Sequence, residues 1–184
     1  MLFRSLFWGN DAEGNDLADF DACPVCHSAR YKLTPAGNRK PVKVLRYFPL
    51  RDRLDRLYMC EATAKAMRWH GEREYLHDAD NMIHISDGEA WKHINNEFPD
   101  YAADVRNVRL GLSTDGFNPF GNMNLAYSIW PVILIPYNLP PWMCMKKEYN
   151  MLSLLIPEPG YPGKCLDVYM RHLIEEVKIG RAHV

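Results

Sequence analysis

The segment at residues 107–157 constrains the fold of this chain more than any other part of it. Three apolar runs follow one another there, and turns rich in Gly, Pro and Asn separate them. Runs of this length and composition are typical of β-strands, and we predict strands at 107–114, 131–137 and 149–156. The first predicted strand ends just before Asp115, which therefore stands at the start of a glycine-containing turn.

A helix is predicted to follow the third strand. Apolar side chains recur there every three or four residues, at Leu166, Tyr169, Met170, Leu173 and Val177. Three strands followed by a helix are how an RNase H-like core begins, within the α/β (α+β) class. We expect one antiparallel sheet with the terminal helix, 165–177, against a face of it. In a complete core, a parallel strand and a further helix would come next, beyond the end of this chain.

The first half of the chain is expected to be loop-rich and then helical. Its basic stretch contains Pro49, which separates a short strand from the start of a helix. Residues 60–70 are rich in Ala and long side chains, which favour helix. Asp87 is a candidate cap for a short helix at 88–98, which Pro99 ends.

The composition is that of a globular protein. Hydrophobic residues make up 47% and aromatic residues 12%, which argues against disorder, and we expect the core to contain three tryptophans, Trp91, Trp130 and Trp142. The net charge of −1 gives no general argument for nucleic acid, since DNA-binding modules are usually strongly basic. The apolar runs contain prolines and are too short for a membrane span. Five cysteines without a signal peptide favour a reducing compartment.

Asp115 is the candidate catalytic residue. An Asp-Gly pair is by itself a turn signal, in which the carboxylate bonds the backbone amides just after it, such as those of Phe117 or Asn118. The functional alternative is a ligand for Mg²⁺, a hard ion that needs carboxylate oxygens on rigid elements. A nuclease with two such ions positions the attacking water and the leaving 3′-oxygen between them. One carboxylate holds magnesium poorly, so this chain alone should not cut DNA.

Several stretches of the sequence resemble the transposases of plant CACTA (En/Spm-type) DNA transposons. The most specific is the run around Asp115, LGLSTDGFNPFGNM. The others are DGEAWKHI at 87–94, VRLGL at 108–112, WPVILIPYNLPPWMCMK at 130–146 and MLSLLIP at 151–157. The resemblance implies that Asp115 is the first acid of a DDE/D triad that uses Mg²⁺. It also implies a nuclear protein whose full-length form cuts and joins transposon-end DNA, and it is compatible with a homo-oligomer.

The other two acids of such a triad should lie beyond this C-terminus. Three acids on the predicted terminal helix, Asp167, Glu175 and Glu176, are better explained as a solvated face, with Glu175 one turn from Arg171. The alternative to an enzyme fragment is a truncated or domesticated remnant that binds DNA or a partner without catalysis. The DNA downstream of the Lys178 codon distinguishes the two, because an open frame supplying the missing acids supports the enzyme.

Cys23 and Cys26, in the sequence CPVC, form half of a tetrahedral zinc site. In the resembled family another cysteine pair precedes this knuckle, and its absence before residue 23 leads us to expect a shortened N-terminus. His27 directly follows Cys26 and could bind zinc only after a sharp bend. We therefore expect weak zinc binding at most. Cys60 is expected to be buried as a small apolar residue.

Residues 39–56 carry seven Lys or Arg and two Asp. One interpretation is phosphate contact with DNA, which depends on salt and not on sequence. The other is a solvated strand and helix edge whose arginines pair with the aspartates. The candidate DNA-binding residues are Arg39, Lys40, Lys43, Arg46, Arg51 and Arg53.

We divide the chain into four parts. The final IGRAHV looks like the translation of a sequencing-library adapter, and we expect the native sequence to end near Lys178. The parts are a loop-rich segment with half a zinc knuckle (1–38), a basic and helical pre-domain (39–104), a truncated RNase H-like core (105–178) and an adapter-derived tail (179–184).

Overall fold

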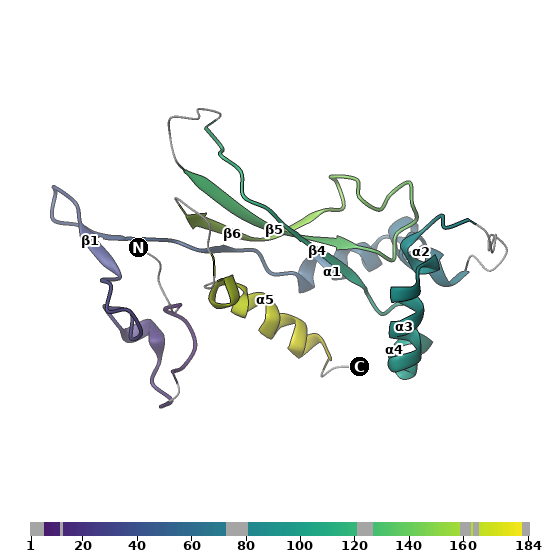
Figure 1. Ribbon diagram of the computed structural model, residues 1–184, viewed down its shortest axis with the longest axis horizontal. Helices are drawn as coiled ribbons and strands as arrows, with labels where there is room; N and C mark the ends of the chain where they lie inside the picture. The colour runs from purple at the N-terminus through teal and green to yellow at the C-terminus, as the bar shows by residue number, and fades with distance from the viewer. Residues whose placement is uncertain are drawn as a thin grey trace. The chain divides into compact units, whose positions relative to one another are not determined.

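The computed structural model describes residues 6–11, 13–72, 81–120, 127–158, 163 and 166–181 (Figure 1). These residues form a mixed α/β fold with two antiparallel sheets and five α-helices. The strands are β1 (Tyr31–Leu33), β2 (Arg39–Pro41), β3 (Arg46–Tyr47), β4 (Leu110–Thr114), β5 (Ser128–Pro136) and β6 (Met151–Glu158). The helices are α1 (Arg51–Met59), α2 (Glu61–Glu72), α3 (Glu89–Glu97), α4 (Pro99–Ala103) and α5 (Leu166–Arg181), with 3-10 turns η1 (Leu17–Asp19) and η3 (Ile85–Asp87).

The elements belong to two compact units. Unit 1 comprises Met1–Phe48, Asp115–Pro131 and Leu154–Val184, and unit 2 comprises Pro49–Thr114 and Val132–Ser153. β1, β2, β3 and α5 lie in unit 1, whereas α1 to α4 and β4 lie in unit 2. β5 and β6 each contribute residues to both units.

The larger sheet contains all three strands that the sequence predicts, in the order β3-β6-β5-β4. β4 pairs antiparallel with β5, so that Leu110 lies opposite Pro136 and Thr114 lies opposite Val132. β3 pairs antiparallel with β6. The prediction that the three runs share one sheet is confirmed, and β4 is an edge strand among the described residues. The smaller sheet is the β1-β2 hairpin.

The bounds of all three strands differ from the prediction, and β6 is shifted by two residues, from 149–156 to Met151–Glu158. β4 begins three residues late, at Leu110, because the side chain of Asn138 accepts the hydrogen bond of the Arg109 N–H (2.7 Å). β5 runs for nine residues through both Pro131 and Pro136, although we expected these prolines to shorten its ladder. A proline lacks only its N–H, and its carbonyl can still accept a ladder hydrogen bond.

The helices of unit 2 largely follow the sequence pattern. α1 begins after Pro49, and α2 covers the helix predicted at 60–70. α3 ends before Pro99, which is the first residue of the short, unpredicted helix α4. Within the described ranges, none of the helices has the length and apolar character needed to cross a membrane.

Asp87 does not cap α3, contrary to the prediction. The N-cap of α3 is Gly88, which provides no side-chain hydrogen bond. The Asp87 carboxylate instead accepts hydrogen bonds from the backbone N–H groups of Ile83 (3.0 Å) and His84 (2.9 Å). Asp87 is the third residue of η3, and from that position its carboxylate reaches back to the preceding amides in a capping box.

The core of unit 2 forms where α2 meets the end of β5 and the turn after it. Its buried apolar cluster consists of Met67, Ile135, Leu139 and Cys144. Trp91 is also buried, as expected, but Trp142 is 59% exposed, which contradicts its predicted place in the core. The rings of Trp142 and Trp69 form a T-shaped pair with centroids 5.4 Å apart.

In unit 1, α5 packs against β3. Tyr47 of β3 donates a hydrogen bond to the carboxylate of Glu176 and stacks on the ring of His172, with centroids 5.2 Å apart. Tyr169 and Leu173, one helical turn apart, are buried. The predicted terminal helix therefore exists, and it continues to Arg181, beyond its predicted end at 177.

Candidate functional site

Asp115 directly follows β4 and is exposed to solvent. Its Oδ1 accepts a hydrogen bond from the N–H of the next residue, Gly116, at 2.7 Å. The N–H of Phe117, one of the amides expected to bond Asp115 in a simple turn, donates instead to the carbonyl of Ile129 (3.1 Å). Backbone pairing with β5 therefore resumes at Phe117, two residues after Asp115. Asp115 thus lies between two paired positions and not in an open loop.

Gly116 lies under the indole ring of Trp130. A Cβ at this position would come within 2.4 Å of Trp130 Cζ2, closer than real Cβ contacts allow. The glycine after Asp115 is thus required by packing as well as by the turn that the sequence suggests. The residue that follows Asp115 is therefore held in place by its contact with Trp130.

The acids of α5 do not complete a site around Asp115. Glu175 pairs with Arg171 one turn earlier (3.0 Å), as predicted for a solvated helix face. Glu176 accepts the hydrogen bond of Tyr47, and Asp167 is exposed in the first turn. Glu175 and Glu176 are therefore engaged locally, which favours the structural interpretation of these two acids.

The Cys23 and Cys26 pair lies in a closed hairpin. The Cys23 N–H donates to the carbonyl of Ser28 (2.9 Å), and the His27 N–H donates to the carbonyl of Cys23 (2.8 Å). His27 has φ = +55°, in the left-handed region, so the chain does bend sharply after Cys26. Cys23 is fully buried, Cys26 is half-buried, and both are thiols.

These residues do not by themselves fit a metal site. Zinc prefers four ligands and the hairpin offers two thiols. In the part of the chain that the structure describes, no group of three or more His, Cys, Asp or Glu side chains is placed to hold a metal ion. Among the described residues, no such group of side chains forms around Asp115 to hold magnesium either.

Cys60 is exposed, not buried as predicted. It stands just before α2, where hydrogen bonds from the backbone N–H groups of Thr63 and Ala62 lower the pKa of its thiol. Cys144 shows the opposite behaviour, because burial raises the pKa of its thiol. The sequence alone did not predict that Cys60 and Cys144 differ in exposure and in the direction of their pKa shifts.

The six candidate DNA-binding residues fall in both units. Arg39 on β2 forms an exposed ion pair with Asp21 (3.1 Å), and Lys40 beside it is exposed. Arg46 is exposed on β3. Arg53 donates from Nε to the carbonyl of Pro49 (3.0 Å), at the start of α1. The remaining two are Lys43, half-buried before β3, and Arg51, exposed in α1.

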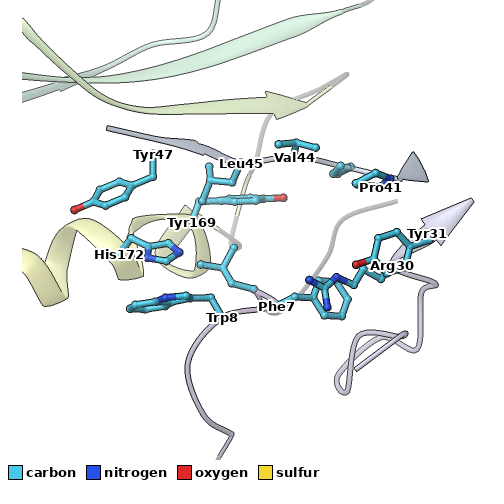
Figure 2. A pocket seen from close by; sticks show the side chains of 12 residues that line it. Phe7, Trp8, Arg30, Tyr31, Pro41, Val44, Leu45, Tyr47, Tyr169 and His172 are labelled. Carbon is cyan, nitrogen blue, oxygen red and sulfur yellow. The ribbon is translucent and has the colours of Figure 1, made fainter. Parts of the chain in front are cut away.

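Sequence reasoning missed an aromatic cavity in unit 1, of about 310 Å³ (Figure 2). Its walls come from the N-terminal segment, the β1-β2 hairpin, the run into β3 and α5. Because these segments are far apart in the chain, no local spacing reveals the cavity. Its aromatic side chains are Phe7, Trp8, Tyr31, Tyr47, Tyr169 and His172, and its cations are Arg30 and Lys43.

A polar cluster in unit 2 surrounds Trp91. The Arg109 guanidinium lies 4.0 Å from the Trp91 ring centroid and donates to the side-chain oxygen of Asn95 (2.5 Å). The ring of His70 stands edge-on to Trp91, at 5.2 Å between centroids. Burial, followed by the positive charge of Arg109, lowers the pKa of His70.

The protein-family model described as transposase family tnp2 matches residues 79–180 of the chain. The matched segment includes β4, Asp115, β5 and β6. Searches of curated proteins and of solved structures found no match. Because the matched residues make up more than half of the 184 in the chain, this protein belongs to the transposase family tnp2.

Proposed function

We propose that this chain forms the beginning of the catalytic region of a CACTA-type DDE/D transposase, with Asp115 as the first carboxylate of the triad. The observation that supports this most is the position of Asp115, exposed at the end of the first strand of the family-matched segment. The strand order adds support. β6, β5 and β4 are neighbours in that order, as the first three strands of an RNase H-like core are expected to be.

The proposal also accounts for the position of β4 at the edge of the sheet among the described residues. An RNase H-like core continues with a strand parallel to the first one, and β4 is an edge strand among the described residues. We infer that a fourth strand pairs with β4 in the longer protein and positions a second carboxylate beside Asp115. Because the described residues do not complete a magnesium site, the 184-residue chain should not cleave DNA by itself.

In the longer protein, the proposed activity is Mg²⁺-dependent cleavage of transposon-end DNA by water, followed by joining of the freed 3′-hydroxyl to target DNA. The role of Asp115 is to supply a negatively charged oxygen at the end of β4. Transposon-end DNA, a nuclear location and a homo-oligomeric state belong to the same proposal.

The test compares Asp115→Asn with Asp100→Asn in the longer protein. Asparagine retains the oxygen that accepts the Gly116 N–H but lacks the charge, so it should leave the fold intact and abolish strand cleavage. Asp100 is an exposed acid in the first turn of α4, and its replacement should leave cleavage unchanged. Cleavage retained by Asp115→Asn would exclude the catalytic assignment.

A second candidate is a non-catalytic remnant that binds DNA. The observation in its favour is the exposed charge of Lys40 and Arg46, together with the absence of a three-ligand metal group among the described residues. Binding through phosphate contacts would weaken steeply with salt and show no preference for sequence. The remnant is favoured if the purified chain binds duplex DNA in this way and the longer reading frame supplies no further acids.

A further inference from the structure

The cavity of unit 1 has the dimensions and lining of a ligand site. Its volume of about 310 Å³ falls at the lower end of the ~300–1,000 Å³ that is usual for small-ligand pockets. Aromatic rings lie in succession along one wall: the Trp8 and His172 ring centroids are 3.7 Å apart, and Tyr47 stacks on His172 (Figure 2). Trp8 is 40% exposed, so its ring is accessible from solvent.

The charges around the cavity select for an anionic or neutral aromatic ligand. Arg30 is held in place by hydrogen bonds to the carbonyls of Ala18 (2.5 Å) and Phe20 (3.3 Å). Its guanidinium lies 4.7 Å from the Phe7 ring centroid. Lys43 adds a second cation to the lining, and none of the lining residues that the structure describes is Asp or Glu, although Glu176 accepts a hydrogen bond from Tyr47 behind the wall. A quaternary ammonium ligand would meet like charge here, although aromatic cages commonly bind such cations.

His172 contributes a ring rather than a charge. Burial lowers the pKa of His172, with Arg171 acting in the same direction and Glu175 opposing. The imidazole is therefore neutral at neutral pH and presents a flat surface for stacking. Lys40 on β2 and Arg46 on β3, both exposed in the same unit, flank the Pro41–Leu45 run that forms one wall.

We propose that this cavity binds an unstacked base of single-stranded DNA, stacked on the aromatic wall, while the neighbouring basic side chains contact the adjoining phosphates. Stacking on aromatic side chains beside a basic track is the general mode of single-strand binding without sequence preference. The proposal deepens the proposed function, on which it rests for the choice of DNA as ligand. It assigns to unit 1 a role separate from that of Asp115.

The test is equilibrium binding of the 184-residue chain to a labelled single-stranded oligonucleotide of about 12 nucleotides. A second oligonucleotide with the same phosphates but abasic sites throughout isolates the contribution of the bases. We expect the abasic strand to bind about tenfold more weakly or worse, as loss of base stacking requires. Equal binding of the two strands, or no binding of either, would overturn the proposal.

Substitutions of single tryptophans test whether the bases bind in the cavity. Trp8→Ala should weaken binding of the base-containing strand about tenfold, whereas Trp8→Phe, which keeps an aromatic face, should retain most of it. Trp142→Ala is the matched control, because Trp142 is an exposed tryptophan of unit 2 and its loss should change nothing. An equal effect of Trp8→Ala and Trp142→Ala would contradict the assignment. Tetramethylammonium should not compete, and competition by it would show a cation cage instead.

Failure of the cavity proposal can be distinguished from failure of the catalytic proposal. Asp115→Asn should bind the single strand as the unaltered chain does. If that variant of the longer protein still cleaves DNA, the catalytic proposal fails while base-dependent binding stands. If the longer protein cleaves as proposed but base dependence is missing, the cavity assignment alone is wrong.

Discussion

The indole ring of Trp130 occupies the space into which a side chain at residue 116 would project. A Cβ on Gly116 would lie 2.4 Å from Trp130 Cζ2 and 2.5 Å from Cε2. Both atoms belong to the rigid indole, so neither can move without displacing the whole ring. The turn that positions Asp115 is therefore packed against β5 at a residue where a larger side chain does not fit.

Replacement of Gly116 by Ala should lower the free energy of unfolding by about 1–3 kcal/mol, the usual effect of overpacking. Urea denaturation of the purified chain measures it. The double variant Gly116→Ala/Trp130→Leu should lose less than the sum of the two single variants, because the smaller side chain removes the clash. A neutral Gly116→Ala would show that the ring and the turn separate readily.

Asn138 should be among the most sensitive polar residues of unit 2. It is fully buried, and its side chain accepts the N–H of Arg109 (2.7 Å) and donates to the carbonyl of Asn107 (3.0 Å). Asn138→Ala leaves both backbone groups unpaired, at about 1–3 kcal/mol for each that water cannot reach. Asn96→Ala, at an exposed position of α3, should leave the unfolding free energy unchanged or slightly raised. Similar unfolding midpoints for the two variants would contradict this account.

The strands were predictable from the sequence because their signal is local. The runs that became β4, β5 and β6 each have the apolar, branched composition of a buried strand, and α5 has a clear helical period. The start of β4 was not predictable, because a side chain, that of Asn138, takes the place of a backbone acceptor. The cavity was not predictable either, since Trp8 and His172 meet only through tertiary folding. The position of Asp115 was a local inference, and its role stays a prediction.

The stability of the protein should fall in mildly acidic solution because of His70. Its pKa is lowered from 6.5 in the folded chain, chiefly by burial and then by Arg109, so the unfolded chain binds a proton that the folded chain does not. Stability is therefore retained above about pH 6.5 and lost as the pH falls toward the lowered value. His70→Gln should flatten the fall in melting temperature between about pH 7 and 5. His172→Gln measures the contribution of the other histidine whose pKa burial lowers. An unchanged slope in His70→Gln would refute the assignment.

Alkylation should distinguish two cysteines. Cys60 is exposed and its pKa is lowered by backbone N–H groups at the start of α2, whereas Cys144 is buried and its pKa is raised. Because the thiolate is the reactive form, iodoacetamide at neutral pH should modify Cys60 well before Cys144. Peptide mass spectrometry over time measures both rates in one sample. Faster labelling of Cys144 would mean that the α2 packing opens readily.

Folding should not depend on zinc. The hairpin of Cys23 and Cys26 is closed by backbone hydrogen bonds, and the described residues supply no third ligand. The melting temperature should be the same with and without a chelator, and metal analysis should find much less than one zinc per chain. Stoichiometric zinc would show that further ligands complete the site. Cys23→Ser and Cys26→Ser would then show whether the hairpin is part of it.

The amide of Asn138 also helps to fix the register of β4. Successive side chains on a strand point to opposite sides, so a slip of one residue would exchange the two faces of β4. Asn138 bonds the backbone of Asn107 and of Arg109 just before β4 begins, and these bonds oppose a slip of the strand by one residue. A buried side chain outside the strand thus helps to set which residues of β4 face each side of the sheet.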